Sequence, residues 1–380
     1  MNHLSKFSLF IVCVVSVVAL SATGVPTNHA SSQTEEYWKV SPGKDDRSLD
    51  QWNLSRKSGI AIDDYEIDSL GAGIVVAVVD TGVNPHREFT DRMLPGYDFV
   101  SDPVISGGGD GRDPDVSDPG SSVEDPSCRD GKGAVAPASW HGTYVYGIIA
   151  AENDGAGISG VSPSAKILPV RASGNCREDN PDVADGIIWA SGGQVTNVPS
   201  NKHVADVIVV SLSESSKCDE WLGSAINFAE SNGSSVVLSA GNKGVDAKLS
   251  NPTNCGHGIS VGASDKNGDM AYYSNWGENV DVWAPGGDVR TRVQDGIPSS
   301  IDLSSGTWEG RDGYGYYQGS SPAAPHVAGV IAGMKGSGFD GANDEIQEIL
   351  LGCSRSIAPE GSARAVPILN AACAINTVKT

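Results

Sequence analysis

The chain is poor in positive charge and in aromatic side chains. Its 26 Lys and Arg residues are outnumbered by 47 Asp and Glu residues, which gives a formal net charge of −21, and aromatic residues make up 6% of the chain. Such an acidic chain repels phosphate backbones, which argues against nucleic acid as a partner. Apolar residues still make up 39%, enough for a sizeable core, so wholesale disorder is not expected.

Long hydrophobic runs are absent beyond the first part of the chain. Lys6 precedes an apolar run at residues 7–20, and small residues follow it, which is the pattern of a secretory signal peptide. The run is short for a membrane span, since a spanning helix takes roughly 20 apolar residues. We expect a signal peptide at 1–24, a short polar extension at 25–50 and one domain at 51–380. The mature protein should be secreted or associated with the cell surface, without stable membrane insertion.

No pair of cysteines has the CxxC spacing of a zinc site. Of the seven cysteines, Cys13 falls in the expected signal peptide. The even number that remains favours disulfides in an exported protein. These cysteines are Cys128, Cys176, Cys218, Cys255, Cys353 and Cys373. We favour the pairs Cys176–Cys218 and Cys353–Cys373, although spacing alone leaves other pairings, or some buried free thiols, open.

Glycine and proline are abundant, at 47 and 20 residues, and predict many turns. Several short apolar runs between the turns are typical of strands buried on both faces. These runs are 74–79, 166–171, 207–212, 235–240 and 259–263. Apolar residues at helical spacing occupy 182–191 and 220–232. Strands that alternate with helices predict an α/β fold with a mainly parallel central sheet covered on both faces.

Three segments carry residues with chemistry. Asp80 ends the buried run VAVVD, and the carboxyl ends of parallel strands gather functional groups. His141 precedes Gly142 and a helical apolar pattern. Ser321 lies between a Gly-rich turn and an Ala-rich helix, where small neighbours would let a substrate backbone reach its hydroxyl, and Pro322 suits the first turn of a helix. Taken singly, these residues could equally be a structural Asp, an incidental His and a helix-capping Ser.

Together, the motifs DTG, HGT and GSSPAAPHVAG, in the order Asp, His, Ser, resemble the subtilisin-like serine protease (subtilase) family over about residues 50–375. The resemblance implies a subtilisin-like three-layer α/β/α sandwich and a secreted serine endopeptidase that acts as a monomer on proteins or peptides. In that family's triad, Ser321 would attack the scissile carbonyl, His141 would take and return its proton, and Asp80 would hold the imidazole.

The same resemblance assigns further site residues. VVLSAGNKG resembles the family's oxyanion strand, which makes Asn242 a side-chain donor beside the backbone N–H of Ser321. The family binds its substrate as an added strand. On this basis Ser211, Leu212 and Ser213 would line the cleft, and Ser239, Ala240 and Gly241 would form one wall of the primary specificity pocket.

A structural calcium ion is the expected cofactor. ENDGAGI, at residues 152–158, resembles a calcium loop of many subtilisins, and hard cations take six to eight oxygen ligands. The implied ligands are Gln51, Glu88, Glu152, Asp154, Ala156 and Ile158; a plain Asn-Asp-Gly turn is the alternative. The Gly- and Asp-rich insert at 101–139, which is too polar to build a core, resembles an insert of some secreted bacterial subtilases. It could bind a second calcium through Asp110, Asp113, Asp115 and Asp118.

Some positions depart from the family pattern. Tyr144 and Tyr146 replace a His and a small residue, and Ser213 and Glu214 replace glycines that keep the cleft open, which leaves the substrate preference undetermined. The short segment before the domain resembles mycosins in lacking a large prodomain, so we expect folding without one. The competing interpretation is a catalytically silent binding protein on the same scaffold. An ester hydrolase is disfavoured, because Ser321 lacks the GxSxG context and the residue order differs.

Overall fold

The computed structural model describes residues 49–107, 111–120 and 137–379, except 64, 90, 175 and 305, and the backbone of 38–40. All of them belong to one contact unit, Thr34–Thr380. The expected signal peptide and most of the expected extension lie outside the described residues. No helix in the described part of the chain has the length and apolar character needed to cross a membrane.

Seven parallel strands form the central sheet, in the order β3-β4-β2-β5-β6-β7-β8. Its strands are β2 (Val75–Asp80), β3 (Tyr97–Asp98), β4 (Lys166–Arg171), β5 (Val207–Val210), β6 (Ser235–Ser239), β7 (Ile259–Ser264) and β8 (Val282–Pro285). The five predicted strands are all present. Their continuous apolar runs arise because the sheet is covered on both faces.

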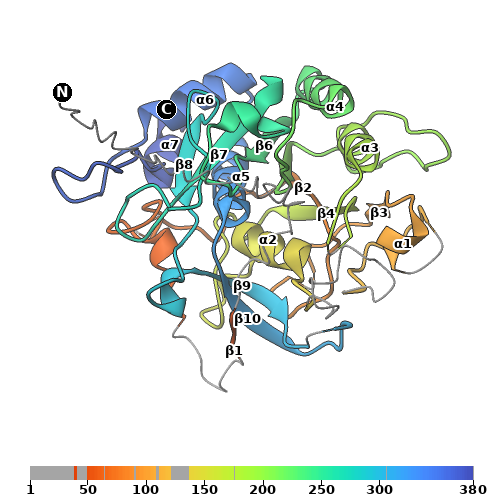
Figure 1. Cartoon of the computed structure of the whole chain (residues 1–380), viewed down its shortest axis with the longest axis horizontal. Helices are drawn as coiled ribbons and strands as arrows, with labels where there is room; N and C mark the ends of the chain where they lie inside the picture. The colour runs from red at the N-terminus through yellow and green to blue at the C-terminus, as the bar shows by residue number, and fades with distance from the viewer. Residues whose placement is uncertain are drawn as a thin grey trace, which may run out of the picture. The chain divides into compact units, whose positions relative to one another are not determined.

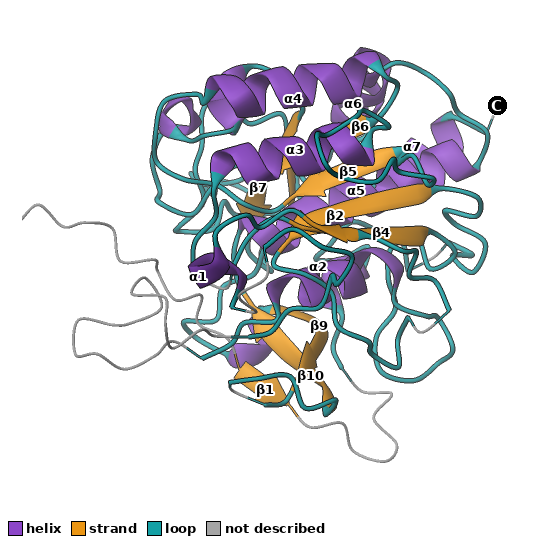
Figure 2. Ribbon diagram, turned by 90° about the vertical axis from the view of Figure 1, so that its right-hand side faces the viewer, coloured by secondary structure: helices purple, strands orange, loops and turns teal. Residues whose placement is uncertain are grey.

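Helices cover the two faces of this sheet in separate layers (Figure 2). The helices are α1 (Pro103–Ser106), α2 (His141–Ala150), α3 (Asn180–Ala190), α4 (Glu220–Ser231), α5 (Ser320–Gly336), α6 (Asn343–Gly352) and α7 (Ala371–Thr377). Val76 and Val78 of β2 pack in the core with α2 and α5, whereas Ala77 and Val79 pack with α3 and α4. This alternation along one strand produces the predicted three-layer sandwich.

A smaller antiparallel sheet, in the order β1-β10-β9, packs against α2 (Figure 1). Its strands are β1 (Trp38–Val40), β9 (Ile297–Asp302) and β10 (Asp312–Tyr317). Tyr144 of α2 donates its hydroxyl to the carbonyl of Ile297 and stacks on Tyr317, with ring centroids 4.1 Å apart. Tyr146 stacks on Phe89 at 4.0 Å. The two tyrosines that depart from the family pattern therefore anchor the helix that begins at His141.

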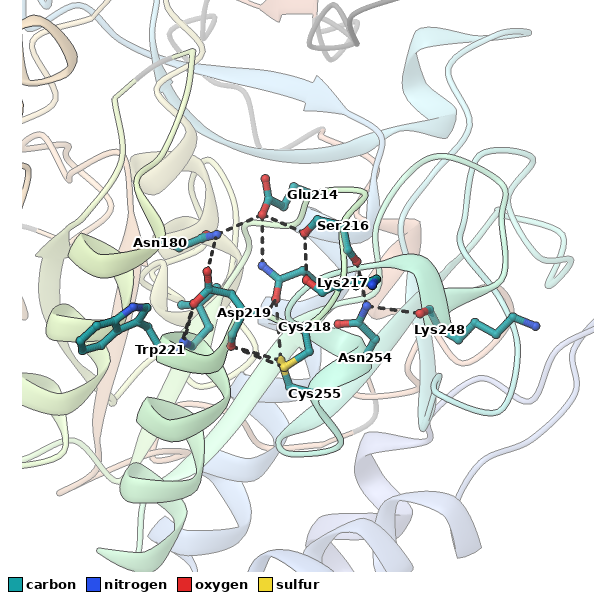
Figure 3. Close-up of a disulfide and its surroundings, with 12 residues drawn as sticks. Asn180, Glu214, Ser216, Lys217, Cys218, Asp219, Trp221, Lys248, Asn254 and Cys255 are labelled. Carbon is teal, nitrogen blue, oxygen red and sulfur yellow. Dashed lines mark hydrogen bonds between the residues drawn. A yellow bond between two sulfur atoms is a disulfide. The ribbon is translucent and has the colours of Figure 1, made fainter.

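Two disulfides join described residues. Cys218 bonds Cys255, with the Cα atoms 4.9 Å apart (Figure 3). Cys353 bonds Cys373, with the Cα atoms 5.5 Å apart. The second pair is confirmed. The predicted pair Cys176–Cys218 is wrong, because Cys218 bonds Cys255, and Cys176 takes part in a different disulfide. A backbone bridge between Glu214 and Asn251 brings the loops after β5 and β6 together, and this places Cys218 beside Cys255.

Candidate active site

Asp80 and His141 form a buried hydrogen-bonded pair where the end of β2 meets the start of α2. The two Asp80 carboxylate oxygens lie 2.7 and 2.9 Å from Nδ1 of His141. The backbone N–H of Thr81 also donates to the carboxylate at 2.7 Å. Because an ionised carboxylate only accepts hydrogen bonds, Nδ1 carries the proton, and the lone pair of the neutral ring lies on Nε2.

Gly142 makes the approach of α2 to β2 possible. A Cβ atom at this position would overlap the carbonyl of Gly82 and press against Asp80. Only a residue without a side chain lets the helix begin close enough for His141 to reach the carboxylate. The HG dipeptide of the sequence motif is thus a packing requirement of the pair.

Ser321 is held at the same edge of the sheet, at the start of α5. Its hydroxyl donates to the carbonyl of Ser211 at 3.1 Å, and the hydroxyl of Ser211 donates back to the Ser321 carbonyl at 3.2 Å. Ser211 directly follows Val210 of β5, which pairs with Val79 of β2. Since neighbouring strands lie about 4.8 Å apart, Ser321 is fixed one strand away from Asp80.

Asn242 is fastened to the start of α5. Its side-chain oxygen accepts the backbone N–H of Ser320 at 2.7 Å, so Nδ2 is the end of the amide that points elsewhere and donates. The backbone N–H of Gly241 donates to the Ser320 hydroxyl at 2.9 Å. The loop after β6 and the serine helix therefore fix each other, and the Asn242 amide lies beside the residue that precedes Ser321.

The six predicted substrate-contact residues follow two neighbouring strands. Ser211, Leu212 and Ser213 follow β5, whereas Ser239 ends β6 and Ala240 and Gly241 follow it. Ser239 and Ala240 are buried, and the Ala240 carbonyl accepts the side chain of Asn275 at 2.8 Å. Leu212 and Ser213 face a hollow. The two strand ends are thus adjacent along one edge of the sheet.

His326, which reads as structural in the sequence, supports the serine helix from within. Its ring is fully buried, with Nδ1 2.7 Å from the carbonyl of Pro322 and Nε2 2.8 Å from Nδ2 of Asn53. The carbonyl can only accept and the amide nitrogen can only donate, so the ring is neutral. Burial lowers its pKa to about 4.

Sequence reasoning missed a link between the acidic insert and the Asp80–His141 pair. The Thr81 hydroxyl donates to the buried carboxylate of Asp118 at 2.7 Å and accepts the backbone N–H of Gly142 at 3.2 Å. Gly120 donates its N–H to the other carboxylate oxygen at 2.8 Å. Burial raises the pKa of Asp118. The sequence could not show this contact, because nothing in the insert indicates which of its acids is buried beside the DTG motif.

Among the described residues of the insert, Asp113, Asp115 and Asp118 do not form a group that could hold a metal ion. Asp113 accepts the backbone N–H of Asp115, and Asp115 accepts both the backbone N–H and the hydroxyl of Ser117. Asp110 lies outside the described residues. Asp113 and Asp115 are thus satisfied by their own turns, and Asp118 by Thr81 and Gly120.

The implied calcium residues gather around the loop at 152–159. Glu88 is buried, and its carboxylate accepts the hydroxyl of Tyr314 and the backbone N–H of Ile158. Burial, with a smaller effect from the charge of Asp154, raises the pKa of Glu88 to about 7. Gly157 leaves the necessary space, since a Cβ there would overlap both Glu88 and Tyr314.

The remaining predicted ligands make their own local contacts. The Gln51 amide donates to the Ser159 carbonyl at 2.9 Å and accepts its N–H at 2.8 Å. Asp154 accepts the N–H of Ala156 at 2.8 Å, and Glu152 pairs with Arg92 at 3.1 Å. No group of three or more His, Cys, Asp or Glu side chains arranged to hold a metal occurs among the described residues. Apart from the two carboxylates of Glu88 and Asp154, the ligand oxygens would be amide and backbone carbonyls.

Comparison with known proteins identifies the family of this chain. Residues 71–365 match the subtilase family. The chain belongs to the subtilase family. It is 39% identical, over 76% of its length, to an extracellular protease of Xanthomonas campestris, and 35% identical, over 78%, to an extracellular basic protease of Dichelobacter nodosus. In each case the match spans 48% of the relative, so this chain covers about half the length of these two proteins.

Solved structures show the same fold. A protease from Pseudoalteromonas arctica superposes with a TM-score of 0.82 at 42% identity, and the match covers 89% of this chain and all of that one. Fervidolysin from Fervidobacterium pennivorans, a keratinolytic enzyme related to subtilisin, gives a TM-score of 0.61 at 27% identity, over 88% of this chain and 48% of that one. The predicted fold class and family are therefore confirmed.

Proposed function

We propose that this subtilase is a secreted serine endopeptidase that hydrolyses peptide bonds through an acyl-enzyme on Ser321. The observation that carries the proposal is the buried Asp80–His141 hydrogen bond at the sheet edge that also holds Ser321. Nδ1 of His141 donates to Asp80, so the basic nitrogen is Nε2, the position from which a general base acts in this family.

The reaction uses these groups in two steps. The Ser321 hydroxyl attacks the scissile carbonyl while Nε2 of His141 takes its proton, and the imidazolium then protonates the leaving amine. Water attacks the acyl-enzyme with the same imidazole as base, which releases the carboxylate product and restores the serine hydroxyl. Asp80 keeps the imidazole in the required tautomer and stabilises its charged form.

Charge that develops on the carbonyl oxygen needs donors. We assign this role to Nδ2 of Asn242, together with the backbone N–H of Ser321. The Ser320 N–H, by fixing the Asn242 side-chain oxygen, turns the amide so that its nitrogen donates. A donor fixed before the reaction stabilises the transition state without reorganisation.

Proteins or peptides are the proposed substrates, because the relatives bear the names of extracellular proteases. The strand ends at 211–213 and 239–241 would pair with an extended peptide through main-chain hydrogen bonds. Such recognition tolerates many sequences, which suits an enzyme that cuts within proteins.

A structural calcium ion at the loop 152–159 is part of the proposal. The donor chemistry fits, since Glu88 and Asp154 supply carboxylates that have no cationic partner among the described side chains, and the other candidate donors are amide and backbone oxygens. The ion would neutralise buried negative charge and fasten the loop. Chelation should then lower the melting temperature; an unchanged value would count against the site.

A fluorophosphonate probe tests the catalytic proposal. The purified protein should be labelled, and Ser321→Ala should abolish labelling while leaving the protein folded. Ser337→Ala, the same change at the far end of α5, is the matched control and should keep full labelling. A folded wild-type protein that takes up no probe would instead favour a silent binding protein.

A further inference from the structure

Asp118 is a buried acid of the insert that lies beside the candidate catalytic pair. One of its carboxylate oxygens accepts the Thr81 hydroxyl at 2.7 Å, and the other accepts the backbone N–H of Gly120 at 2.8 Å. Burial, and to a smaller extent the negative charge of Asp80, raises the pKa of Asp118. The two carboxylates are therefore close neighbours, yet the proposed mechanism uses only Asp80.

Thr81 is the residue through which Asp118 reaches the pair. Its backbone N–H donates to the Asp80 carboxylate at 2.7 Å, and its hydroxyl accepts the backbone N–H of Gly142 at 3.2 Å. Thr81 follows Asp80 in the chain, and Gly142 follows His141. One buried side chain thus contacts the backbone of the helix that carries the imidazole, while its own backbone holds the carboxylate.

The hydrogen bonds fit an ionised Asp118. The Thr81 hydroxyl already accepts the N–H of Gly142, so its own proton points to the acid. Both oxygens of Asp118 therefore receive donors. The buried guanidinium of Arg171 supplies the opposite charge, because it counteracts the effect of burial on the pKa of Asp118 and also donates through Nε to the Thr81 carbonyl at 3.2 Å.

A second link fixes the backbone of Asp118 to the same helix. The side-chain oxygen of Asn84 accepts the backbone N–H of Asp118 at 3.0 Å, and the side-chain nitrogen donates to its carbonyl at 2.9 Å. The backbone N–H of Asn84 donates to the hydroxyl of Thr143 in α2 at 2.9 Å. The carboxylate thus reaches Thr81 from a backbone that is itself held in place.

Stability alone does not account for buried charges at this position. Removing a carboxylate and a guanidinium from water costs free energy that their attraction often fails to recover, so an apolar cluster of similar size would serve the fold as well. Proton transfer, by contrast, depends steeply on geometry, since a displacement of about 1 Å can cost on the order of 10²-fold in rate. Alignment of the catalytic pair is the use that these contacts suit.

We propose that Asp118 is a positioning residue of this protease: through the Thr81 hydroxyl it keeps Asp80 and His141 aligned for proton transfer. Asp118 contacts neither the substrate nor the reacting atoms. The inference rests on the proposed peptidase function and deepens it, because it assigns support of the catalytic pair to the acidic insert. A structural acid, whose loss would alter folding but not the turnover of the folded protein, is the competing outcome.

A double-mutant cycle tests the proposal. Asp118→Asn keeps the size and one acceptor oxygen but removes the charge, and it should lower kcat for a fluorogenic peptide about tenfold at unchanged KM. Thr81→Val removes the hydroxyl and should lower kcat by at least as much. The double variant should be no slower than Thr81→Val, because the acid acts only through that hydroxyl. Thr81→Ser restores the hydroxyl and should recover nearly the wild-type kcat.

Asp115→Asn is the matched control. Asp115 is an exposed acid of the same insert, and its carboxylate accepts only from Ser117, so this variant should keep the wild-type kcat. Circular dichroism and the fraction labelled by the fluorophosphonate probe give the amount of folded, active enzyme to which each kcat is normalised. Should Asp118→Asn fail to fold, Asp118→Ser takes its place in the cycle.

The outcomes separate the inference from the proposed function. Wild-type kcat in folded Asp118→Asn, a change confined to KM, or a loss that adds in full to that of Thr81→Val would overturn the positioning role and leave the peptidase intact. A folded wild-type protein that takes up no probe and cleaves no peptide would overturn the proposed function itself.

Discussion

Asp80 and Glu88 are both buried carboxylates, yet the molecule surrounds them differently. Asp80 ends a strand and accepts from an imidazole that can itself carry charge. Glu88 lies in a loop region and accepts from a phenol and a backbone amide, both neutral. The first environment suits the transfer of a proton, and the second suits the attachment of one loop to another. Changes near Asp80 should therefore alter turnover, whereas changes near Glu88 should alter stability.

The largest effect is expected for Asp80→Asn. The amide would no longer hold His141 in the tautomer with a basic Nε2, and kcat should fall by a factor on the order of 10⁴. Peptide hydrolysis and circular dichroism measured together would separate this from unfolding. Asp344→Asn, at the exposed start of α6, should behave as wild type. Near-normal turnover of Asp80→Asn would mean that another acid serves His141.

Asn242 gives the next largest effect and a way to separate two roles. Asn242→Leu should lower kcat by about 10²- to 10³-fold with little change in KM, as loss of an oxyanion donor does. Asn242→Asp keeps an oxygen for the Ser320 N–H but has no donor, so it should be equally impaired. Recovery of activity in Asn242→Asp would show that Asn242 only fastens Ser320.

The free energy of unfolding should depend on pH through His326, whereas turnover should not. Its folded pKa of about 4 lies below its ordinary value of 6.5, so the unfolded state binds the extra proton between these values. The contribution of neutral His326 to the free energy of unfolding should be fully present above pH 6.5. It should fall by about 3 kcal/mol as the pH drops toward 4. Urea unfolding in a Ser321→Ala background, which prevents self-digestion, would measure this. His326→Gln should flatten the pH dependence.

The smallest effect is expected on the Glu88 side of the comparison. Tyr314→Phe removes one donor from a buried carboxylate and should lower the free energy of unfolding by about 1–3 kcal/mol. Turnover of a small peptide should stay at the wild-type value. Thermal melts beside peptide hydrolysis give both quantities for one variant. A loss of turnover at an unchanged melting temperature would contradict the division between the two carboxylates.

Regular elements with strong patterns were predictable from the sequence. The apolar run that ends at Asp80 indicated a buried strand, and the apolar stretch after His141 and Gly142 indicated a buried helix. The small antiparallel sheet was not predicted, because IPSSID and DGYGYY lack the apolar alternation of strands. These strands are stabilised instead by hydroxyl contacts with α2, such as Ser299 and Ser300 to the carbonyls of Tyr144 and Thr143.

Contacts between loops were the part that sequence could not supply. The partner of Cys218 depends on which loop lies beside it, and spacing along the chain carries no such information. The same holds for the contact of Tyr314 with Glu88. Each of these contacts joins residues that are distant in sequence and that share no sequence pattern. The resemblance to subtilases identified the family motifs but not these contacts.

Asp118 limits how far this protein could be shortened by engineering. The insert at 101–139 has the composition of an expendable spacer, and a designer of a minimal enzyme would delete it first. Its Asp118, however, accepts a hydrogen bond from the hydroxyl of Thr81, which itself bonds to the Asp80 carboxylate and to the backbone N–H of Gly142, the residue after His141. A trimmed protein that loses this carboxylate would leave the threonine hydroxyl to realign, so a compact version has to keep residues 116–120 or redesign position 81.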